Sequence, residues 1–414
     1  MTAPSQPTNF KFTNQGLTNA DIDDVFVRKE FLYKNLPGSL WGVGSNCYGS
    51  LGDNSTIHKS SPVQTVSTGT NWRKVYTAGS SNWGTATIAI KTDGTLWTWG
   101  RNSCGVLGDN SSTHKSSPVQ TVSTGTNWKQ ASVGCFTAGA VKTDGTLWMW
   151  GLSYRGNLAN FDSTTRSYSS PIQTISCGTN WKQVSVGGSF SNVMAVKTDG
   201  TLWEWGGYGL SVACFRSSPV QAVTCGTNWK MVSSGGAQMG IKTDGTLWIW
   251  GANATCWHGA GNFSGGVRSS PMQTISTGTN WKTITQDMTR GSVAAIKTDG
   301  TLWLWGYNYN GQLGDNTRAT QYSPVQTIST GTNWRDITMG AWGAVATKTD
   351  GTLWTWGMNA RGQLGINSTS GLTTGTRSSP VQTVVAGTSW ATTGSGGDCC
   401  GGAHFFIGTG LPFK

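Results

Sequence analysis

The residues that could carry acid–base, nucleophilic or metal chemistry are few in this chain and widely spaced. Four histidines stand at positions 58, 114, 258 and 404, and only two of the 18 acidic residues are glutamates, Glu30 and Glu204. His58 and His114 occupy the same position in neighbouring sequence repeats, which favours a structural or surface role. The chain contains no GxSxG, HExxH or P-loop motif. We therefore expect no catalytic residues, no metal site and no cofactor, and we classify the protein as not an enzyme.

The basic residues form a second set that could do chemistry, namely the binding of anions. The net charge is +11, from 29 basic and 18 acidic residues. One repeated basic position follows a repeated tryptophan: Arg73, Lys129, Lys182, Lys230, Lys282 and Arg335. Another lies three residues before a repeated proline: Lys59, Lys115, Arg216, Arg268 and Arg377. Repetition around a closed fold would turn each set into a basic ring.

Such a ring could attract nucleic acid, an anionic polysaccharide or an acidic protein surface, with an affinity that falls as salt rises. The alternative is a solvated rim of charge that keeps a protein of low charge content soluble. No helix-turn-helix pattern or aromatic-rich nucleic-acid motif accompanies the bases. We therefore do not expect specific nucleic-acid binding.

Three tryptophans have no place in the repeats and are candidates for contact with a ligand or partner. Twenty of the 23 tryptophans recur at fixed repeat positions, whereas Trp83, Trp257 and Trp342 fall in variable intervals. Large aromatics in such loops either face a ligand or cap a local hydrophobic gap. The variable loops also contain Tyr307, Tyr309 and Arg361, which join this set of candidate contact residues.

Composition and segment patterns exclude several classes of protein. The chain is 11% charged and contains 59 glycines, so strong helix formers are scarce and a mainly helical protein is excluded. Residues 1–20 are polar and no apolar run is long enough to span a bilayer, which predicts neither a membrane span nor a signal peptide. Nine cysteines without CxxC spacing favour buried thiols over a disulfide framework or a zinc site.

The elements that must position all these residues are repeats of about fifty residues. KTDGTLWxWG occurs in six complete copies, and GSLWGVG at 38–44 is a truncated seventh. The Asp-Gly pair between apolar segments predicts a hairpin in which both turn residues have positive φ. With the SPVQ and NWxxV segments, each unit supplies about four short antiparallel strands, which form one blade of a propeller.

The two chain ends predict how the ring closes. The first unit lacks its KTDG half and the last unit lacks its LWxWG half, so the missing halves are complementary. Residues 403–414 can supply the inner hairpin arm that residues 39–44 complete. We predict an all-β fold, a single seven-bladed β-propeller over residues 38–414, closed by both chain ends and preceded by a short N-terminal arm at 1–37.

Residues 1–37 differ in composition from the repeats. Residues 19–34 place acids early and bases late, as a short helix would, with Val25, Phe26, Phe31 and Leu32 among its apolar residues. One interpretation is an arm that attaches the protein to another protein. The alternative is a strap packed against the side of the propeller.

The loop WGYNYNGQLGDN at 305–316, and its counterpart WGMNARGQLGIN at 356–367, resemble the signature of the regulator of chromosome condensation repeat family. The repeats that carry this resemblance cover about nine-tenths of the chain. The resemblance implies a propeller that serves as a nucleotide exchange factor for a small GTPase or as an interaction scaffold. The Gly-Gly-x-x-His-Thr-like segment of the family is missing here, which argues against exchange activity. The signature is also absent from the units after Gly206 and Gly251, where we expect different loops.

The close match between repeats, with GTNWKxVS and the leader at 18–42, is similar to repeat proteins of this family from marine bacteriophages, particularly those of cyanobacteria. That resemblance implies a tail- or fibre-associated virion protein, made in the host cytoplasm. Its expected partners are other virion proteins through the N-terminal arm, and a host-surface glycan or protein. The alternative function is a cellular interaction or regulatory propeller, including a guanine nucleotide exchange factor-like scaffold.

Overall fold

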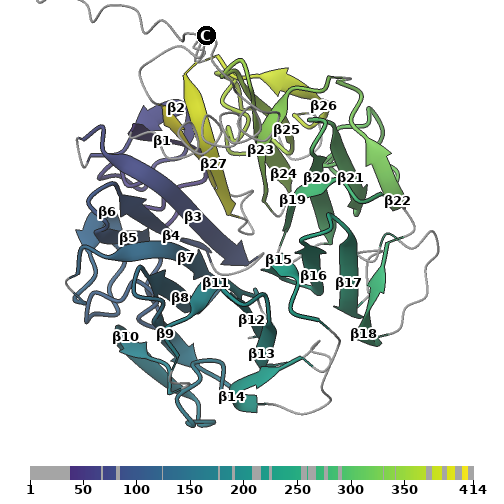
Figure 1. The fold of residues 1–414 in the computed structure, drawn as a ribbon. Coiled ribbons are helices and arrows are strands. Elements are labelled where there is room, and N and C mark those ends of the chain that lie inside the picture. Colours follow the sequence, from purple (N-terminus) through teal and green to yellow (C-terminus); the bar gives the residue numbers. More distant parts are fainter. Residues whose placement is uncertain are drawn as a thin grey trace, which may run out of the picture. The chain divides into compact units, whose positions relative to one another are not determined.

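The computed structural model describes residues 38–408 apart from 67–68, 81–83, 124, 176–177, 189–191, 208–215, 223–225, 253–258, 260–266, 275–277, 288–290, 330, 341, 370–374, 385–388 and 397–402. The predicted arm at 1–37, with Val25, Phe26, Phe31 and Leu32, lies outside these residues. All regular secondary structure in the described residues is β-strand. The 28 strands form seven four-stranded antiparallel sheets (Figure 1). No helix in this part of the chain is long and apolar enough to cross a membrane.

Each sheet is one blade. Its four strands lie side by side, with the innermost strand at the centre of the ring and the outer strand at the rim. The innermost strands are β3 (Trp72–Ser80), β7 (Trp128–Val133), β11 (Trp181–Val186), β15 (Trp229–Ser234), β19 (Trp281–Gln286), β23 (Trp334–Met339) and β27 (Trp390–Gly396). The second strands are β4 (Gly84–Lys91), β8 (Thr137–Lys142), β12 (Asn192–Lys197), β16 (Ala237–Lys242), β20 (Ser292–Lys297), β24 (Gly343–Lys348) and β28 (Ala403–Gly408). The third strands are β5 (Leu96–Gly100), β9 (Leu147–Ser153), β13 (Leu202–Gly206), β17 (Leu247–Ala252), β21 (Leu302–Gly306), β25 (Leu353–Gly357) and β1 (Ser39–Gly44). The outer strands are β6 (Lys115–Gln120), β10 (Arg166–Gln173), β14 (Arg216–Gln221), β18 (Val267–Gln273), β22 (Gln321–Gln326), β26 (Arg377–Gln382) and β2 (Lys59–Gln64).

The closing blade confirms the predicted shared blade. Its strand order is β2-β1-β28-β27, so two strands from the start of the chain pair with two strands from its end. Ser39 to Gly44 lie opposite Gly408 to Ala403 in an unbroken antiparallel register. The innermost strands follow one another around the ring, and β27 contacts both β23 and β3 (Figure 1). The predicted seven-bladed ring is therefore complete.

The KTDG hairpin forms as predicted, but the predicted turn conformation is wrong. Only the glycine has positive φ, +79° at Gly94, whereas Asp93 does not. The amide of Gly94 donates to the Lys91 carbonyl (3.0 Å) and that of Lys91 to Thr95 (3.1 Å), which is a three-residue loop with a type I turn and a bulge. A Cβ on Gly94 would clash with the Thr126 carbonyl oxygen in the segment that leads into the next blade, so only glycine fits this close approach.

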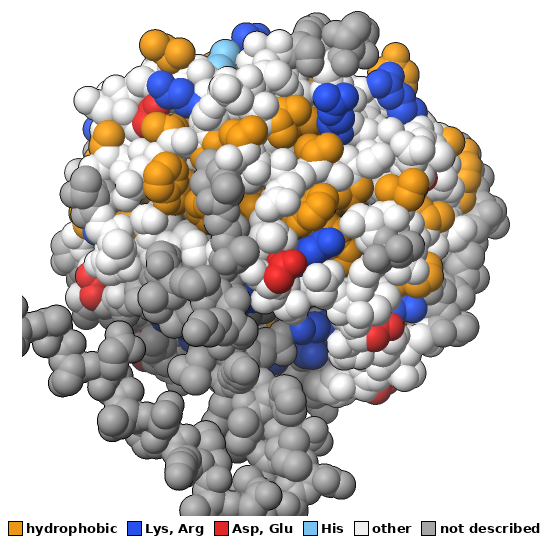
Figure 2. Space-filling view, turned by 90° about the horizontal axis from the view of Figure 1, so that it is seen from above, with side chains coloured by type: hydrophobic (Ala, Val, Ile, Leu, Met, Phe, Trp, Pro, Cys, Tyr) orange, Lys and Arg blue, Asp and Glu red, His pale blue; other side chains and the backbone are white. Residues whose placement is uncertain are grey.

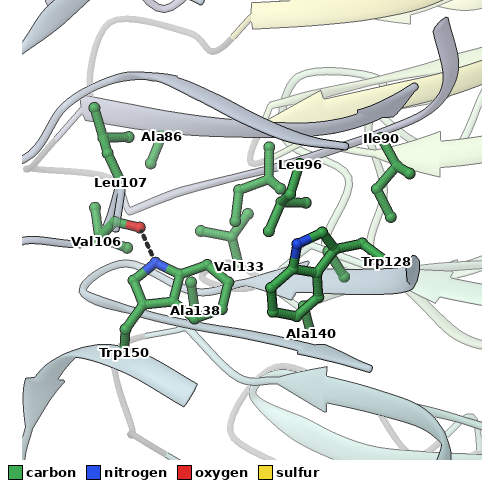
Figure 3. Close-up of a cluster of buried hydrophobic side chains, with 12 residues drawn as sticks. Ala86, Ile90, Leu96, Val106, Leu107, Trp128, Val133, Ala138, Ala140 and Trp150 are labelled. Atoms are coloured by element: carbon green, nitrogen blue, oxygen red, sulfur yellow. Dashed lines mark hydrogen bonds between the residues drawn. The ribbon is translucent and has the colours of Figure 1, made fainter. Parts of the chain in front are cut away.

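The hydrophobic core lies between neighbouring blades, because each sheet is too thin to bury its own faces. Trp128 and Trp150 belong to the blade of β7 to β10, and they pack with Ile90, Leu96 and Leu107 of the preceding blade, β3 to β6. All five side chains are buried (Figure 3). The indole Nε1 of Trp150 donates to the carbonyl of Val106 at 2.7 Å across this interface. Equivalent bonds run from Trp99 to Ser50, from Trp205 to Asn157 and from Trp356 to Gln312.

The signature loop between the third and outer strands folds around a buried asparagine. Asn102 accepts the amide proton of Leu107 (2.9 Å) through Oδ1 and donates to Asp109 (3.0 Å) and to the Thr113 carbonyl (3.2 Å) through Nδ2. Asn46, Asn308 and Asn359 accept the equivalent leucine amide in three other blades. The asparagine therefore makes this loop a rigid extension of the blade.

Candidate functional site

The basic residues that follow the repeated tryptophans lie at the start of six adjacent innermost strands. We call them the inner basic rim: Arg73, Lys129, Lys182, Lys230, Lys282 and Arg335. Each tryptophan is buried between blades, which fixes the backbone from which the next side chain projects. The seventh position, in the closing blade, is Ala391.

Hydrogen bonds show that rim residues of neighbouring blades lie next to one another. Nη2 of Arg73 donates to the carbonyls of Trp128 (2.9 Å) and Lys129 (3.3 Å) in the next blade. Nζ of Lys182 likewise donates to the Lys230 carbonyl at 3.1 Å. At these two blade boundaries the rim residues are therefore direct neighbours rather than isolated side chains.

The electrostatics of the rim are those of like charges held together. Burial lowers the pKa of Lys182, and the ammonium groups of Lys230 and Lys129 lower it further. The pKa of Lys74, the next residue after Arg73, is also lowered, chiefly by burial and then by Arg73, while Asp336 opposes the shift. Since Lys129, Lys182 and Lys230 are exposed, the rim can hold the carboxylates or phosphates of a docked molecule.

The outer basic residues are arranged differently from the inner rim. Lys59 and Lys115 form ion pairs with Asp53 (3.3 Å) and Asp109 (3.5 Å), both from the signature loops. Burial alone would raise the pKa of Asp53, but hydrogen bonds from Ser55 and Asn46 and the Lys59 ammonium together lower it. These two positions of the predicted outer ring therefore carry compensated charge.

The other outer positions differ again. Arg216 and Arg377 are exposed at the start of their outer strands, whereas the side chain of Arg268 lies outside the described residues. The outer ring stays a prediction as a binding site.

The predicted aromatic contact residues come together only in part. Tyr307 and Tyr309 stack with ring centroids 6.4 Å apart, and Tyr309 is 68% exposed. Trp342 and Arg361 are half-buried on other loops, and the Arg361 amide donates to Gln363 at 2.7 Å. Trp83 and Trp257 lie outside the described residues, as do the loops at 208–215 and 253–258 that were expected to differ.

Exposed apolar side chains are a further surface feature. Residues two positions after the outer strands are 40 to 50% exposed in five blades: Val66, Val122, Ile175, Ile328 and Val384. On the side of the molecule seen in Figure 2, hydrophobic side chains gather in a band, with basic and acidic side chains scattered among them.

The histidines and the buried glutamate have structural roles in the described residues. His58 and His114 accept the backbone amides of Asn46 and Asn102, each at 2.9 Å, at the base of the signature loops. His404 is buried in β28, and burial lowers its pKa to about 4. Glu204 accepts the indole proton of Trp250 at 2.8 Å, in a blade whose loop at 208–215 lacks the signature.

Six clusters of one lysine and two tryptophans were not anticipated from the sequence. Nζ of Lys91 lies 4.8 Å from the ring centroid of Trp72 and 4.2 Å from that of Trp97. Lys142, Lys197, Lys242, Lys297 and Lys348 repeat the arrangement. The strict recurrence of the lysine in KTDG was the available signal, but the partner tryptophan is known only once the strand register is known.

Comparison with protein families identifies the repeats. The model of the regulator of chromosome condensation (RCC1) repeat matches residues 93–141, 299–347 and 350–398, and a second model of the same repeat matches 77–106 and 334–363. The matched residues are therefore similar to RCC1 repeats, as the sequence signature predicted, and they lie on a seven-bladed propeller.

Two curated relatives are similar in sequence. The Caenorhabditis elegans homologue of the X-linked retinitis pigmentosa GTPase regulator is 32% identical over 74 residues, which is 18% of this chain and 5% of that protein. The ultraviolet-B receptor UVR8 of Arabidopsis thaliana is 26% identical over 351 residues, covering 79% of this chain and 74% of the receptor.

Solved structures show the same fold. Prp20p of Saccharomyces cerevisiae superposes with a TM-score of 0.77 at 15% identity, covering 93% of this chain and 95% of that one. Human WBSCR16 superposes with a TM-score of 0.73 at 17% identity, covering 90% and 98%. The Prp20p structure was described together with its binding to Gsp1p and histones, and a further structure shows it bound to Kap60.

Proposed function

We propose that this protein is a non-enzymatic interaction scaffold that binds an acidic surface of another protein through its inner basic rim. The observation that carries the proposal is the row of adjacent cations at the start of the innermost strands, seen most directly in Lys182 and its neighbours Lys129 and Lys230. Like charges are held together at a cost in electrostatic repulsion, which an anionic partner would relieve.

The comparisons support an interaction or regulatory propeller over the virion role. The sequence relatives are named for a GTPase regulator and a light receptor, and the similar yeast propeller binds proteins. Exchange activity toward a GTPase is a narrower form of the proposal, which the missing histidine segment of the repeats disfavours. The virion role and attachment through residues 1–37 stay predictions from the sequence.

The proposal is tested by removing the same charge from the two basic sets in turn. The variant Lys129→Gln/Lys182→Gln/Lys230→Gln removes three charges from the inner rim. The matched control Lys59→Gln/Lys115→Gln/Arg377→Gln removes three charges from the outer set. Binding of each protein to poly-glutamate, heparin and duplex DNA is measured by fluorescence anisotropy at low and physiological salt.

We expect the rim variant to weaken binding to poly-glutamate about tenfold or more, and the control variant to change it little. Equal losses in the two variants would show an effect of net charge alone and would contradict a rim site. Preferential binding to duplex DNA would replace the acidic protein partner with nucleic acid.

A further inference from the structure

The signature loop at 102–114 depends on a histidine as well as on its buried asparagine. Nδ1 of His114 accepts the backbone amide proton of Asn102 at 2.9 Å, and Asn102 is the residue whose side chain organises the loop. In the closing blade His58 accepts the amide proton of Asn46 at the same distance. The bond therefore recurs in the two neighbouring blades that carry a histidine at this position.

Only the neutral imidazole can make this bond. A neutral histidine has one ring nitrogen that donates and one that accepts, whereas both nitrogens of the charged form donate. Because Nδ1 of His114 is the acceptor, the proton of the neutral ring lies on Nε2, and a second proton has to bind at Nδ1. Protonation would then place two donors, Nδ1–H and the amide of Asn102, face to face. Acid therefore breaks the bond.

The charged and titratable groups near His114 do not compensate a second proton on the ring. Partial burial lowers the pKa of His114, and the guanidinium of Arg101, which is 7% exposed, lowers it further. The carboxylate of Asp109 in the same loop is paired with the Lys115 ammonium at 3.5 Å. Burial raises the pKa of the Cys104 thiol, so this group stays neutral in acid. The surroundings therefore favour the neutral ring.

The loop at 102–114 contacts both neighbouring blades. The ring of Tyr48, from the closing blade, packs edge-on against the His114 ring with centroids 4.8 Å apart and an interplanar angle of 71°. On the other side the amide of Asn110 donates to the Ser169 carbonyl of β10 at 2.9 Å. His114 is exposed, so a proton from solvent reaches it without unfolding of the blade. A change at His114 therefore alters a surface that three blades share.

We propose that His114 is an acid-sensitive latch, which holds residues 102–114 closed at neutral pH and releases them in acid. The closed loop needs the neutral ring, so it binds a proton more weakly than the open loop does. Each opening then takes up a proton, and the opening equilibrium increases by up to about tenfold for each pH unit below 6.5, the ordinary histidine pKa. The latch is separate from the inner basic rim and does not rest on the proposed function.

The chain contains its own control in the loop at 308–320. Asn308 accepts the amide proton of Leu313 (3.0 Å) and donates to Asp315 (3.1 Å), as the asparagine of the 102–114 loop does with its own leucine and aspartate. The position that corresponds to His114 is Thr320, which does not titrate. This loop therefore has the same internal bonds without the latch.

The latch is tested by amide hydrogen exchange of the full-length protein at about pH 7.5 and about pH 5, with residue-level mass spectrometry. Each exchange rate is divided by its intrinsic rate at that pH, and circular dichroism confirms that the propeller stays folded. We expect the protection of the Leu107 amide to fall about tenfold or more in acid, while that of the Leu313 amide stays unchanged. An equal loss at both amides would show general loosening by acid and would overturn the latch.

Three variants assign the response to His114. His114→Asn keeps an acceptor oxygen and cannot take up a proton, so the Leu107 amide should stay protected at both pH values. His114→Ala removes the acceptor, so this amide should exchange rapidly at both. His58→Asn removes the other histidine and should leave the response of Leu107 as in the wild type. A response that persists in His114→Asn, or wild-type protection in His114→Ala, would overturn the proposal.

Discussion

Two conservative substitutions at one blade interface separate a hydrogen bond from packing. Trp150 and Trp128 are both buried in the cluster between the first two blades (Figure 3). Nε1 of Trp150 donates to the Val106 carbonyl at 2.7 Å, whereas Nε1 of Trp128 is buried with no hydrogen-bond partner in the described residues. Trp150→Phe therefore removes a bond and packing, while Trp128→Phe removes packing and an unsatisfied donor.

The size of the difference follows from these contacts. Both changes replace indole by phenyl and lose a similar apolar area, so the packing loss cancels in the comparison. Trp150→Phe in addition removes the indole donor from the Val106 carbonyl in a buried interface, which costs about 1 to 3 kcal/mol. At an unfolding entropy of about 2.1 cal/mol/K per residue, this corresponds to a melting temperature lower by about 1 to 3 °C than that of Trp128→Phe.

The assay is differential scanning calorimetry of the two variants and the wild type at one protein concentration, with circular dichroism to confirm the fold. Trp150→Phe should melt below Trp128→Phe. Equal melting temperatures, or the reverse order, would refute the argument that hydrogen bonds from third-strand indoles, such as that of Trp150, hold neighbouring blades together.

Three further changes test other parts of the fold. His404→Gln should remove a pH dependence of the unfolding free energy. Burial lowers the pKa of His404 from 6.5 to about 4, so its contribution to stability is complete above pH 6.5 and falls as the pH drops toward 4. Denaturation experiments across this range should show a loss of roughly 3 kcal/mol in the wild type. Asn102→Ala leaves the buried Leu107 amide unpaired and should cost about 1 to 3 kcal/mol, with faster proteolysis within 101–114 as the readout. Gly94→Ala places a Cβ at φ +79° against the Thr126 carbonyl, and should cost more than about 1 kcal/mol of unfolding free energy.

The architecture was predictable because repetition reports it directly. Six LWxWG segments and the truncated copy at 40–44 predict seven blades, and the complementary halves at the two ends predict the pairing of β1 with β28. Pairing within the six complete blades follows from sequence order, since consecutive strands joined by short loops usually pair. The pairing of β1 with β28 follows instead from the repeat half that each chain end lacks. The fold of the ring therefore needed no knowledge of side-chain contacts.

Contacts across strands and blades were not predictable in the same way. The Asp-Gly pair identifies a hairpin, but the backbone angle of Asp93 depends on loop length, and here three residues turn with only Gly94 at positive φ. The spacing of six positions between Asp53 and Lys59 did not predict an ion pair, because the loop must fold around Asn46 before the two side chains meet. A basic ring read from spacing thus becomes paired charge in some blades.

The closing blade, which holds strands from both ends of the chain, departs from the repeat pattern at several positions. Six blades carry the lysine, the small strand residue and the base after the innermost tryptophan, and the lysine lies against both tryptophans in each. The closing blade is assembled from two segments 369 residues apart, as the bond from Ser39 to the Gly408 carbonyl shows. It has changed all three positions, to Gly408, Phe406 and Ala391, while keeping Trp41 and Trp390. The two rings are retained because they are part of the core between blades: Trp390 is buried with Val345 and Phe406, and Trp41 packs against this cluster.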